Sequence, residues 1–170
     1  MKRYYTEQEI KALLKDLTIV IDTREQVNQH ITQYFDSKGI VCKSRKLDTG
    51  DYAAMLQDMT METDVVIERK ASIDELAGNM TVDRDRFERE FLRATANRIK
   101  VYLVIENGSW TDIQMHNYRS KLTPQSFQAS LLSWMARFNV VVMFCKTQET
   151  GKLIHGILYY EAREALKRGI

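Results

Sequence analysis

Apolar side chains follow two different spacings along the chain, and together these predict an alternation of strands and helices. Continuous apolar runs predict buried strands over 17–21, 101–106 and 140–145. Three shorter runs predict further strands over 40–46, 52–56 and 64–69, with a polar, Met-rich hairpin loop between the last two. Apolar stripes at helical spacing predict helices over 25–38, 85–96, 125–138 and 148–167.

Local chain-end signals add detail to the helices. Thr6 and Ser72 are each followed by a glutamate three residues later, which is the capping-box spacing and predicts helices over 6–14 and 72–80. A short helix within a loop is expected over 110–122. Gly39 is expected to end the helix over 25–38. The residues expected on the buried helix faces are Val27, Ile31, Tyr34, Phe35, Phe87, Phe91, Phe127, Leu131, Trp134 and Phe138.

This alternation predicts an α/β fold in which helices flank a central mixed sheet. The absence of repeats and of Pro/Gly linkers favours one domain over 1–170. Within it we expect an N-terminal helix at 6–16, a core at 17–108 and a C-terminal helix-strand-helix at 124–168. The N-terminal helix also favours a complete small protein.

Composition and charge exclude few classes of protein. The net charge is +2, and no run of eighteen apolar residues or signal-peptide stretch is present, so a cytoplasmic protein is expected by default. Cys42 and Cys145 have no metal-ligand spacing, which argues against zinc and disulfides and predicts two small buried residues. Six basic residues between 84 and 100 permit nucleic-acid binding.

Four acidic residues stand at or near predicted strand ends: Asp22, Asp51, Glu68 and Asp74. Carboxylates gathered at the edge of a sheet repel one another unless a cation neutralises them. Hard oxygen donors without a Cys/His set favour Mg²⁺ or Mn²⁺.

The triplet Glu68-Arg69-Lys70 adds a second kind of chemistry. Residues two apart in a strand face the same side, so Glu68 and Lys70 point into one site and Arg69 points away. A carboxylate for a metal beside an ammonium that positions water suits phosphodiester hydrolysis. Asp51, sixteen residues, then Glu-x-Lys is the general pattern of restriction-endonuclease-like nucleases, although Glu-x-Lys alone is common on charged surfaces.

Longer motifs sharpen this pattern into a family resemblance. Ile21-Asp-Thr-Arg-Glu25, Gly50-Asp-Tyr52 and Ile67-Glu-Arg-Lys70 followed by Asp74 resemble the nuclease domain of the XPF family of structure-specific endonucleases. The motifs cover about 18–108. The resemblance implies a restriction-endonuclease-like three-layer α/β fold and cleavage of branched DNA, such as flaps, forks and junctions, in repair or recombination. That family usually continues into a helix-hairpin-helix DNA-binding domain, which these residues do not include.

The resemblance also implies roles for single residues. Asp22, Asp51 and Glu68 would form an acidic site for Mg²⁺ or Mn²⁺, and Lys70 would be the catalytic lysine. Supporting roles would fall to Arg24, Glu25, Arg69 and Asp74. The equivalents of the C-terminal helices form a dimer interface in the family, so a homodimer is expected.

Simpler interpretations stand beside these. Asp22 could end its strand in an Asx-turn and Arg24 could pair with it, while Asp74 could serve only the helix dipole and Glu75 only the helix cap. Arg86, Arg89 and Arg93 share one helix face, which either contacts DNA phosphates or is solvated and paired with neighbouring glutamates.

The expected function is therefore a metal-dependent DNA endonuclease. Two alternatives remain open: a non-catalytic DNA-binding or scaffold module of the same fold, and a nuclease that acts on linear duplex.

Overall fold

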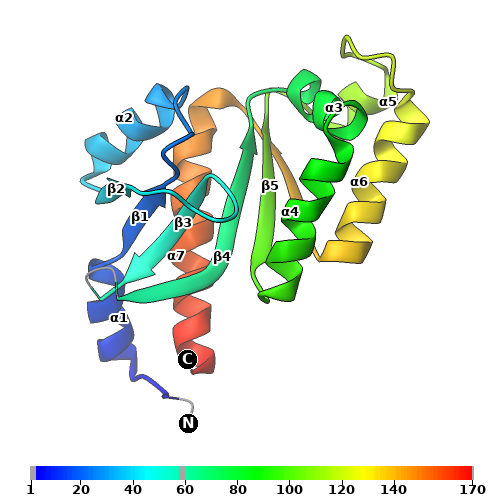
Figure 1. Cartoon of the computed structure of the whole chain (residues 1–170). Helices are drawn as coiled ribbons and strands as arrows, with labels where there is room; N and C mark the ends of the chain where they lie inside the picture. Colours follow the sequence, from blue (N-terminus) through cyan, green and yellow to red (C-terminus); the bar gives the residue numbers. More distant parts are fainter. Residues whose placement is uncertain (1–2, 58–59, 170) are drawn as a thin grey trace. The chain divides into compact units, whose positions relative to one another are not determined.

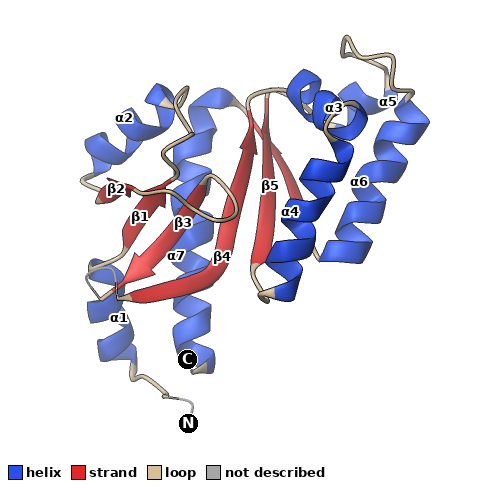
Figure 2. Cartoon of the chain, in the orientation of Figure 1, coloured by secondary structure: helices blue, strands red, loops and turns tan. Residues whose placement is uncertain are grey.

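The computed structural model of the chain describes residues 3–57 and 60–169, and these contain helices and strands in alternation (Figures 1 and 2). The strands are β1 (Thr18–Ile21), β2 (Cys42–Ser44), β3 (Tyr52–Leu56), β4 (Met61–Lys70), β5 (Lys100–Glu106) and β6 (Val141–Cys145). The helices are α1 (Glu7–Lys15), α2 (Gln29–Lys38), α3 (Ile73–Thr81), α4 (Arg84–Ala96), α5 (Trp110–Gln114), α6 (Pro124–Phe138) and α7 (Thr150–Arg168), the last preceded by a 3₁₀ turn at Thr147–Glu149.

The strands are hydrogen-bonded in the order β2-β1-β3-β4-β5-β6. The pairing is mixed, because β1 is parallel to β2 but antiparallel to β3, and β5 is parallel to β6. The predicted mixed sheet is thus confirmed. By compactness the chain divides into two units, 1–66 with 151–170, and 67–150. The single domain expected over 1–170 stays a prediction.

The first unit is organised around β1 and the long helix α7. All four residues of β1 are buried. Helix α7 buries one stripe at four-residue spacing, and the side chains of Ile154, Leu158, Ala162 and Leu166 are fully buried. Gly151, in the first turn of α7, lies so close to Tyr34 that an added Cβ would come within 2.8 Å of the tyrosine Cβ. Helix α1 begins with the predicted capping box of Thr6 and Glu9.

The second unit has an aromatic core between α4 and α6. Trp134 makes edge contacts with Phe87 and Phe91, with ring centroids 5.3 and 5.4 Å apart. Its indole N–H donates to Glu88 at 2.8 Å, so the one polar atom of this buried ring has a partner. The buried stripe predicted for α6, which includes Phe127 and Leu131, is confirmed. The predicted short helix within a loop is α5.

Three expectations about local structure are wrong. The helix predicted over 25–38 begins only at Gln29, and Val27 is 81% exposed rather than buried, because the chain before it follows a turn started by Asp22. Strand β6 is half-buried because it lies at the end of the strand order. Cys42 and Cys145 are half-buried too, at the two outermost strands.

Part of the predicted hairpin loop, residues 58–59, falls outside the described residues. In the described ranges, none of the helices combines the length and the apolar character that crossing a membrane requires.

The aromatic core makes a direct test of the packing possible. We expect Trp134→Ala to lower the free energy of unfolding by about 3–5 kcal/mol, because it opens a cavity beside Phe87 and leaves Glu88 without one donor. Leu92→Ala on the neighbouring helix α4 is the control, since Leu92 is 58% exposed, and should change stability by less than about 1 kcal/mol. Urea unfolding followed by far-UV circular dichroism measures both. Equal losses would contradict the assigned packing.

Candidate active site

Two of the predicted acidic residues, Asp22 and Asp51, are neighbours across a strand pair in the first unit. The antiparallel register that pairs Ile21 with Tyr52 continues by one step, because the Asp22 N–H donates to the Asp51 carbonyl at 2.8 Å. Directly opposed residues of an antiparallel pair lie about 5 Å apart at their Cβ atoms. Gly50 supplies the positive φ of 78° at which the chain enters β3. The turn at Gly50 therefore positions Asp51, and the end of β1 positions Asp22.

The Asp22 carboxylate is buried and accepts four hydrogen bonds. Oδ1 accepts from the Arg24 N–H at 2.8 Å and from Arg24 Nε at 2.7 Å. Oδ2 accepts from the Leu47 N–H at 2.6 Å and from Arg24 Nη2 at 3.1 Å. The bond from the Arg24 backbone is the Asx-turn that the simpler interpretation of Asp22 predicts.

These bonds set the acidity of Asp22. Burial raises the pKa of the carboxyl, but hydrogen bonds from Arg24 and Leu47 and the charge of Arg24 outweigh it and lower the pKa from 3.8 to about 2. Asp22 is thus an anion throughout the physiological range. Arg24 Nη2 also donates to the Leu47 carbonyl at 2.9 Å, and the Arg24 side chain nevertheless remains 65% exposed.

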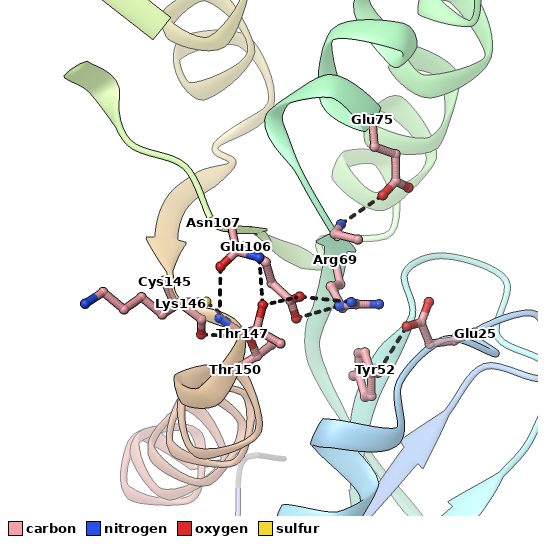
Figure 3. Close-up of polar contacts among 11 residues, drawn as sticks. Glu25, Tyr52, Arg69, Glu75, Glu106, Asn107, Cys145, Lys146, Thr147 and Thr150 are labelled. Atoms are coloured by element: carbon pink, nitrogen blue, oxygen red, sulfur yellow. Dashed lines mark hydrogen bonds and ion pairs between the residues drawn. The ribbon is translucent and has the colours of Figure 1, made fainter. Parts of the chain in front are cut away.

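Glu25 is fixed by the same turn. Its N–H donates to the Asp22 carbonyl at 3.0 Å, and its carboxylate accepts the hydroxyl of the fully buried Tyr52 at 3.3 Å (Figure 3). Within the first unit the structure therefore brings together Asp22, Arg24, Glu25 and Asp51.

In the second unit, Glu68 and Lys70 lie on one face of β4, as the strand alternation predicts. Lys70 Nζ contacts Glu68 Oε1 at 2.8 Å, and both side chains are about nine-tenths buried. The Lys70 ammonium also lies 4.8 Å from the centre of the Phe87 ring and 3.7 Å from Glu75. Burial raises the pKa of Glu68, and the positive charge of Lys70 offsets only part of that effect.

Arg69 points to the opposite face of β4 and is also buried. Its Nε and Nη2 atoms contact the two carboxylate oxygens of Glu106 at 2.8 and 3.0 Å, a bidentate pair that is almost completely shielded from solvent (Figure 3). Thr147 donates its hydroxyl to Glu106 at 3.5 Å and accepts a hydrogen bond from Asn107 at 2.7 Å. Sequence reasoning assigned no role to Glu106. The available signal was an acid that ends an apolar strand, as Glu68 does.

Asp74 and Glu75 follow on α3, where Glu75 serves the helix end and Asp74 also contacts a distant loop. Ser72 caps the helix by accepting the Glu75 N–H at 3.2 Å, while the Glu75 carboxylate accepts the Ala71 N–H at 2.8 Å. Asp74 accepts the Arg119 N–H at 2.7 Å and lies 3.4 Å from the Arg119 guanidinium. Asp74 therefore anchors a distant loop of the same unit.

Among the residues that the structure describes, Arg86, Arg89 and Arg93 form no ion pair with the glutamates of α4. Glu88 contacts Arg84 and Arg137 instead, and Arg86 lies 3.6 Å from Asp83. Arg86, Arg89 and Arg93 are all exposed. The solvated face of the simpler interpretation is present, but without its expected ion pairs, and DNA contact by these residues stays a prediction.

The donors offered to a metal are carboxylates, which suit a hard divalent cation. Over the described ranges, no three His, Cys, Asp or Glu residues are grouped as ready-made ligands. In addition, the four lone-pair positions of the Asp22 carboxylate are taken by Arg24 and Leu47. The chemistry of the donor set fits Mg²⁺ or Mn²⁺, but Asp22 needs a change of partner first.

A mixed sheet with flanking helices defines the α/β class, and here acidic and basic groups stand at the strand ends. Comparison with known proteins then places the chain within it. The model of the ERCC4 domain matches residues 21–157, and the chain belongs to that family of nucleases, which in general depend on divalent metal ions. The predicted family is thereby confirmed. None of the curated protein sequences matches the chain.

Solved structures agree on the fold. The chain is similar to XPF from Aeropyrum pernix, with a TM-score of 0.62 and 17% identity over 84% of this chain and 65% of that one. XPF from the same organism in complex with DNA gives a TM-score of 0.64 and 17% identity over 88% and 66%. The chain thus spans about two thirds of the length of these relatives.

The low pKa of Asp22 predicts how the stability of the fold changes as the pH falls. A carboxyl whose pKa is lower in the folded state stabilises the fold above its ordinary pKa, and that contribution is lost as pH falls from 3.8 towards 2. We expect Asp22→Asn to be less stable than wild type by about 2 kcal/mol at pH 6, and the gap to narrow near pH 3. Urea unfolding at both pH values measures it.

Asp48→Asn is the control, because Asp48 is exposed one residue beyond Leu47 and should change stability little at either pH. A gap between wild type and Asp22→Asn that stays constant from pH 6 to pH 3 would show that the Asp22 charge is not what the fold uses.

Proposed function

We propose that the chain is a metal-dependent DNA endonuclease that hydrolyses phosphodiester bonds, with branched DNA such as flaps, forks and junctions as its substrate. The observation that carries the proposal is the buried Glu68–Lys70 pair on one face of β4. A carboxylate and an ammonium cost free energy to bury, and replacing such a pair with apolar residues often stabilises a protein. Their presence in a member of the ERCC4 family favours a catalytic role.

In this proposal Asp22, Asp51 and Glu68 hold Mg²⁺ or Mn²⁺, and Lys70 is the catalytic lysine. The bound cation would lower the pKa of a water and neutralise charge that develops on the phosphate. Burial raises the pKa of Glu68, so a nearby cation would stabilise the charged form of its carboxylate. Lys70 would donate a hydrogen bond to the attacking water and hold it in line with the phosphorus.

Arg24 would couple DNA binding to the ability of Asp22 to bind a metal ion. Its guanidinium now occupies both Asp22 oxygens, yet the side chain is 65% exposed. A DNA phosphate is a competing bidentate partner for an arginine. Transfer of Arg24 from Asp22 to a phosphate would leave Asp22 an anion with free lone pairs, still fixed by the Leu47 N–H. Glu25, Arg69 and Asp74 keep the supporting roles that the family resemblance implies.

The decisive experiment is cleavage of labelled flap, fork, four-way junction and linear duplex, with Mn²⁺, with Mg²⁺ and with chelator. We expect cutting of branched DNA only when metal is present. Glu68→Gln and Lys70→Ala should each lower the cleavage rate by about 10²-fold or more while DNA affinity changes little. Glu62→Gln is the matched control, because Glu62 lies on the same strand with its side chain 67% exposed.

Each rival has its own outcome. Binding of branched DNA with no metal-dependent cleavage of any substrate would favour the non-catalytic module. Equal cutting of linear duplex and branched DNA would favour the duplex nuclease. Near-full activity of Glu68→Gln or Lys70→Ala would show that the site assignment is wrong.

We also propose that the chain forms a homodimer through its C-terminal helices, as the family resemblance implies. Exposed apolar side chains support it: Tyr160 on α7 is 63% exposed and Leu132 on α6 is 52% exposed. Light scattering should give about twice the 19.9 kDa chain mass at micromolar concentration. Tyr160→Glu should shift the mass towards the monomer, while Val82→Glu, at an 87% exposed position, should not. A monomer in the wild type would refute the dimer.

A further inference from the structure

Residues 115–123, which we call the Arg119 loop, form an ordered surface segment between α5 and α6. Tyr118 donates its hydroxyl to the Leu122 carbonyl at 2.7 Å, and its ring lies edge-on to Phe127 with centroids 5.0 Å apart. The His116 ring contacts the Ser120 carbonyl at 2.9 Å and lies 4.4 Å from the Tyr118 ring. In Figure 1 the loop projects from the chain beyond α5. Its internal contacts give it a defined shape although it has no regular secondary structure.

Asp74 ties this loop to the beginning of α3. Its Oδ1 accepts the Arg119 N–H at 2.7 Å, and its Oδ2 lies 3.4 Å from Arg119 Nε. The Arg119 side chain is nevertheless 94% exposed. The guanidinium is therefore oriented at its Nε edge, while its remaining N–H groups face solvent. An exposed ion pair contributes at most about 1 kcal/mol, so stability alone does not account for this arrangement.

The loop and the chain that follows it carry charge of one sign, although Asp74 and Asp112 contact the loop at Arg119 and Asn117. From residue 113 to residue 148 the sequence contains Arg119, Lys121, Arg137 and Lys146 but neither Asp nor Glu. Lys121 is exposed on the same loop, two residues from Arg119. A segment whose own exposed charges, Arg119 and Lys121, are both positive is suited to a polyanion.

We propose that the Arg119 loop binds the phosphate backbone of DNA, with Arg119 and Lys121 as phosphate contacts and Asp74 as the residue that positions the loop. The inference rests on the proposed nuclease function and extends its substrate footprint. Asp74 follows Lys70 by four residues, a length of chain that reaches at most about 14 Å. At 3.4 Å per nucleotide step along one strand, that reach corresponds to about four nucleotides from Lys70, so the loop would contact phosphates near the proposed cleavage site.

The salt dependence of DNA binding tests the proposal, because it counts phosphate contacts and is insensitive to small structural changes. Binding of a labelled fork is measured in chelator, without cleavage, over a range of salt concentrations. We expect Arg119→Ala and Lys121→Ala each to reduce the slope of log K against log salt by about 0.7–0.9, and the double variant by about twice that. Arg119→Lys should keep the wild-type slope, since it keeps the charge.

Lys152→Ala is the matched control, because Lys152 is an exposed lysine on α7, away from this loop in the sequence, and it removes the same charge. Wild-type slopes in both Arg119→Ala and Lys121→Ala would overturn the proposal, as would an equal loss of slope in Lys152→Ala. Asp74 has its own readout: Asp74→Ala should speed amide hydrogen exchange over 115–123, because the Arg119 N–H loses its acceptor. Unchanged exchange there would refute the positioning role.

The two proposals fail separately. A wild-type protein that cleaves branched DNA while the loop variants keep the wild-type slope refutes the loop and leaves the nuclease intact. A wild-type protein that binds with the expected loop contribution but never cleaves refutes the nuclease alone. A wild-type protein that does not bind DNA refutes both.

Discussion

Three consecutive charged side chains are buried at the end of β4, and much of the second unit is arranged to satisfy them. Glu68, Arg69 and Lys70 are each 7–8% exposed. An unpaired buried charge costs several kcal/mol, so each needs a partner. Glu68 and Lys70 pair with each other on one face of the strand, while Arg69 pairs with Glu106 on the other. The fold therefore supplies an acid, Glu106, at the end of β5, and Thr147, which accepts a hydrogen bond from Asn107, donates its hydroxyl to that acid.

What could be predicted from the sequence is what depends on local spacing. Strand alternation places Glu68 and Lys70 on one face and Arg69 on the other, and the ion pairs agree. Capping spacing locates the beginning of α1, and the apolar stripe of α6 gives its buried residues. The partner of Arg69 could not be predicted, because Glu106 lies 37 residues away and only the pairing of β4 with β5 brings it close. The anchoring of Arg119 by Asp74, 45 residues apart, is missed for the same reason.

The region after β1 shows how a polar side chain overrides helical periodicity. Apolar spacing extends the predicted helix back to Glu25, yet the chain forms a turn in which Asp22 accepts the Arg24 N–H. A carboxylate that bonds its own backbone two residues on competes with helix formation. The same turn delivers Glu25 to the Tyr52 hydroxyl and presents Arg24 at the surface. The functional and the simpler interpretations of Asp22 are thus compatible, since the Asx-turn is the means by which the acidic residue is held in place.

Asp22 and Asp74, two aspartates of the sequence motifs, share one arrangement, because each is paired with an exposed arginine. Asp22 is buried beneath Arg24, and Asp74 is half-covered beside Arg119, while the two arginine side chains are 65% and 94% exposed. In each pair the acid contacts Nε of the guanidinium, while the arginine side chain stays largely exposed to solvent. A site built of carboxylates repels a phosphate backbone. In the proposed function, arginines held by those same carboxylates would offset that repulsion locally and let a chain with a net charge of only +2 bind DNA beside its acidic residues.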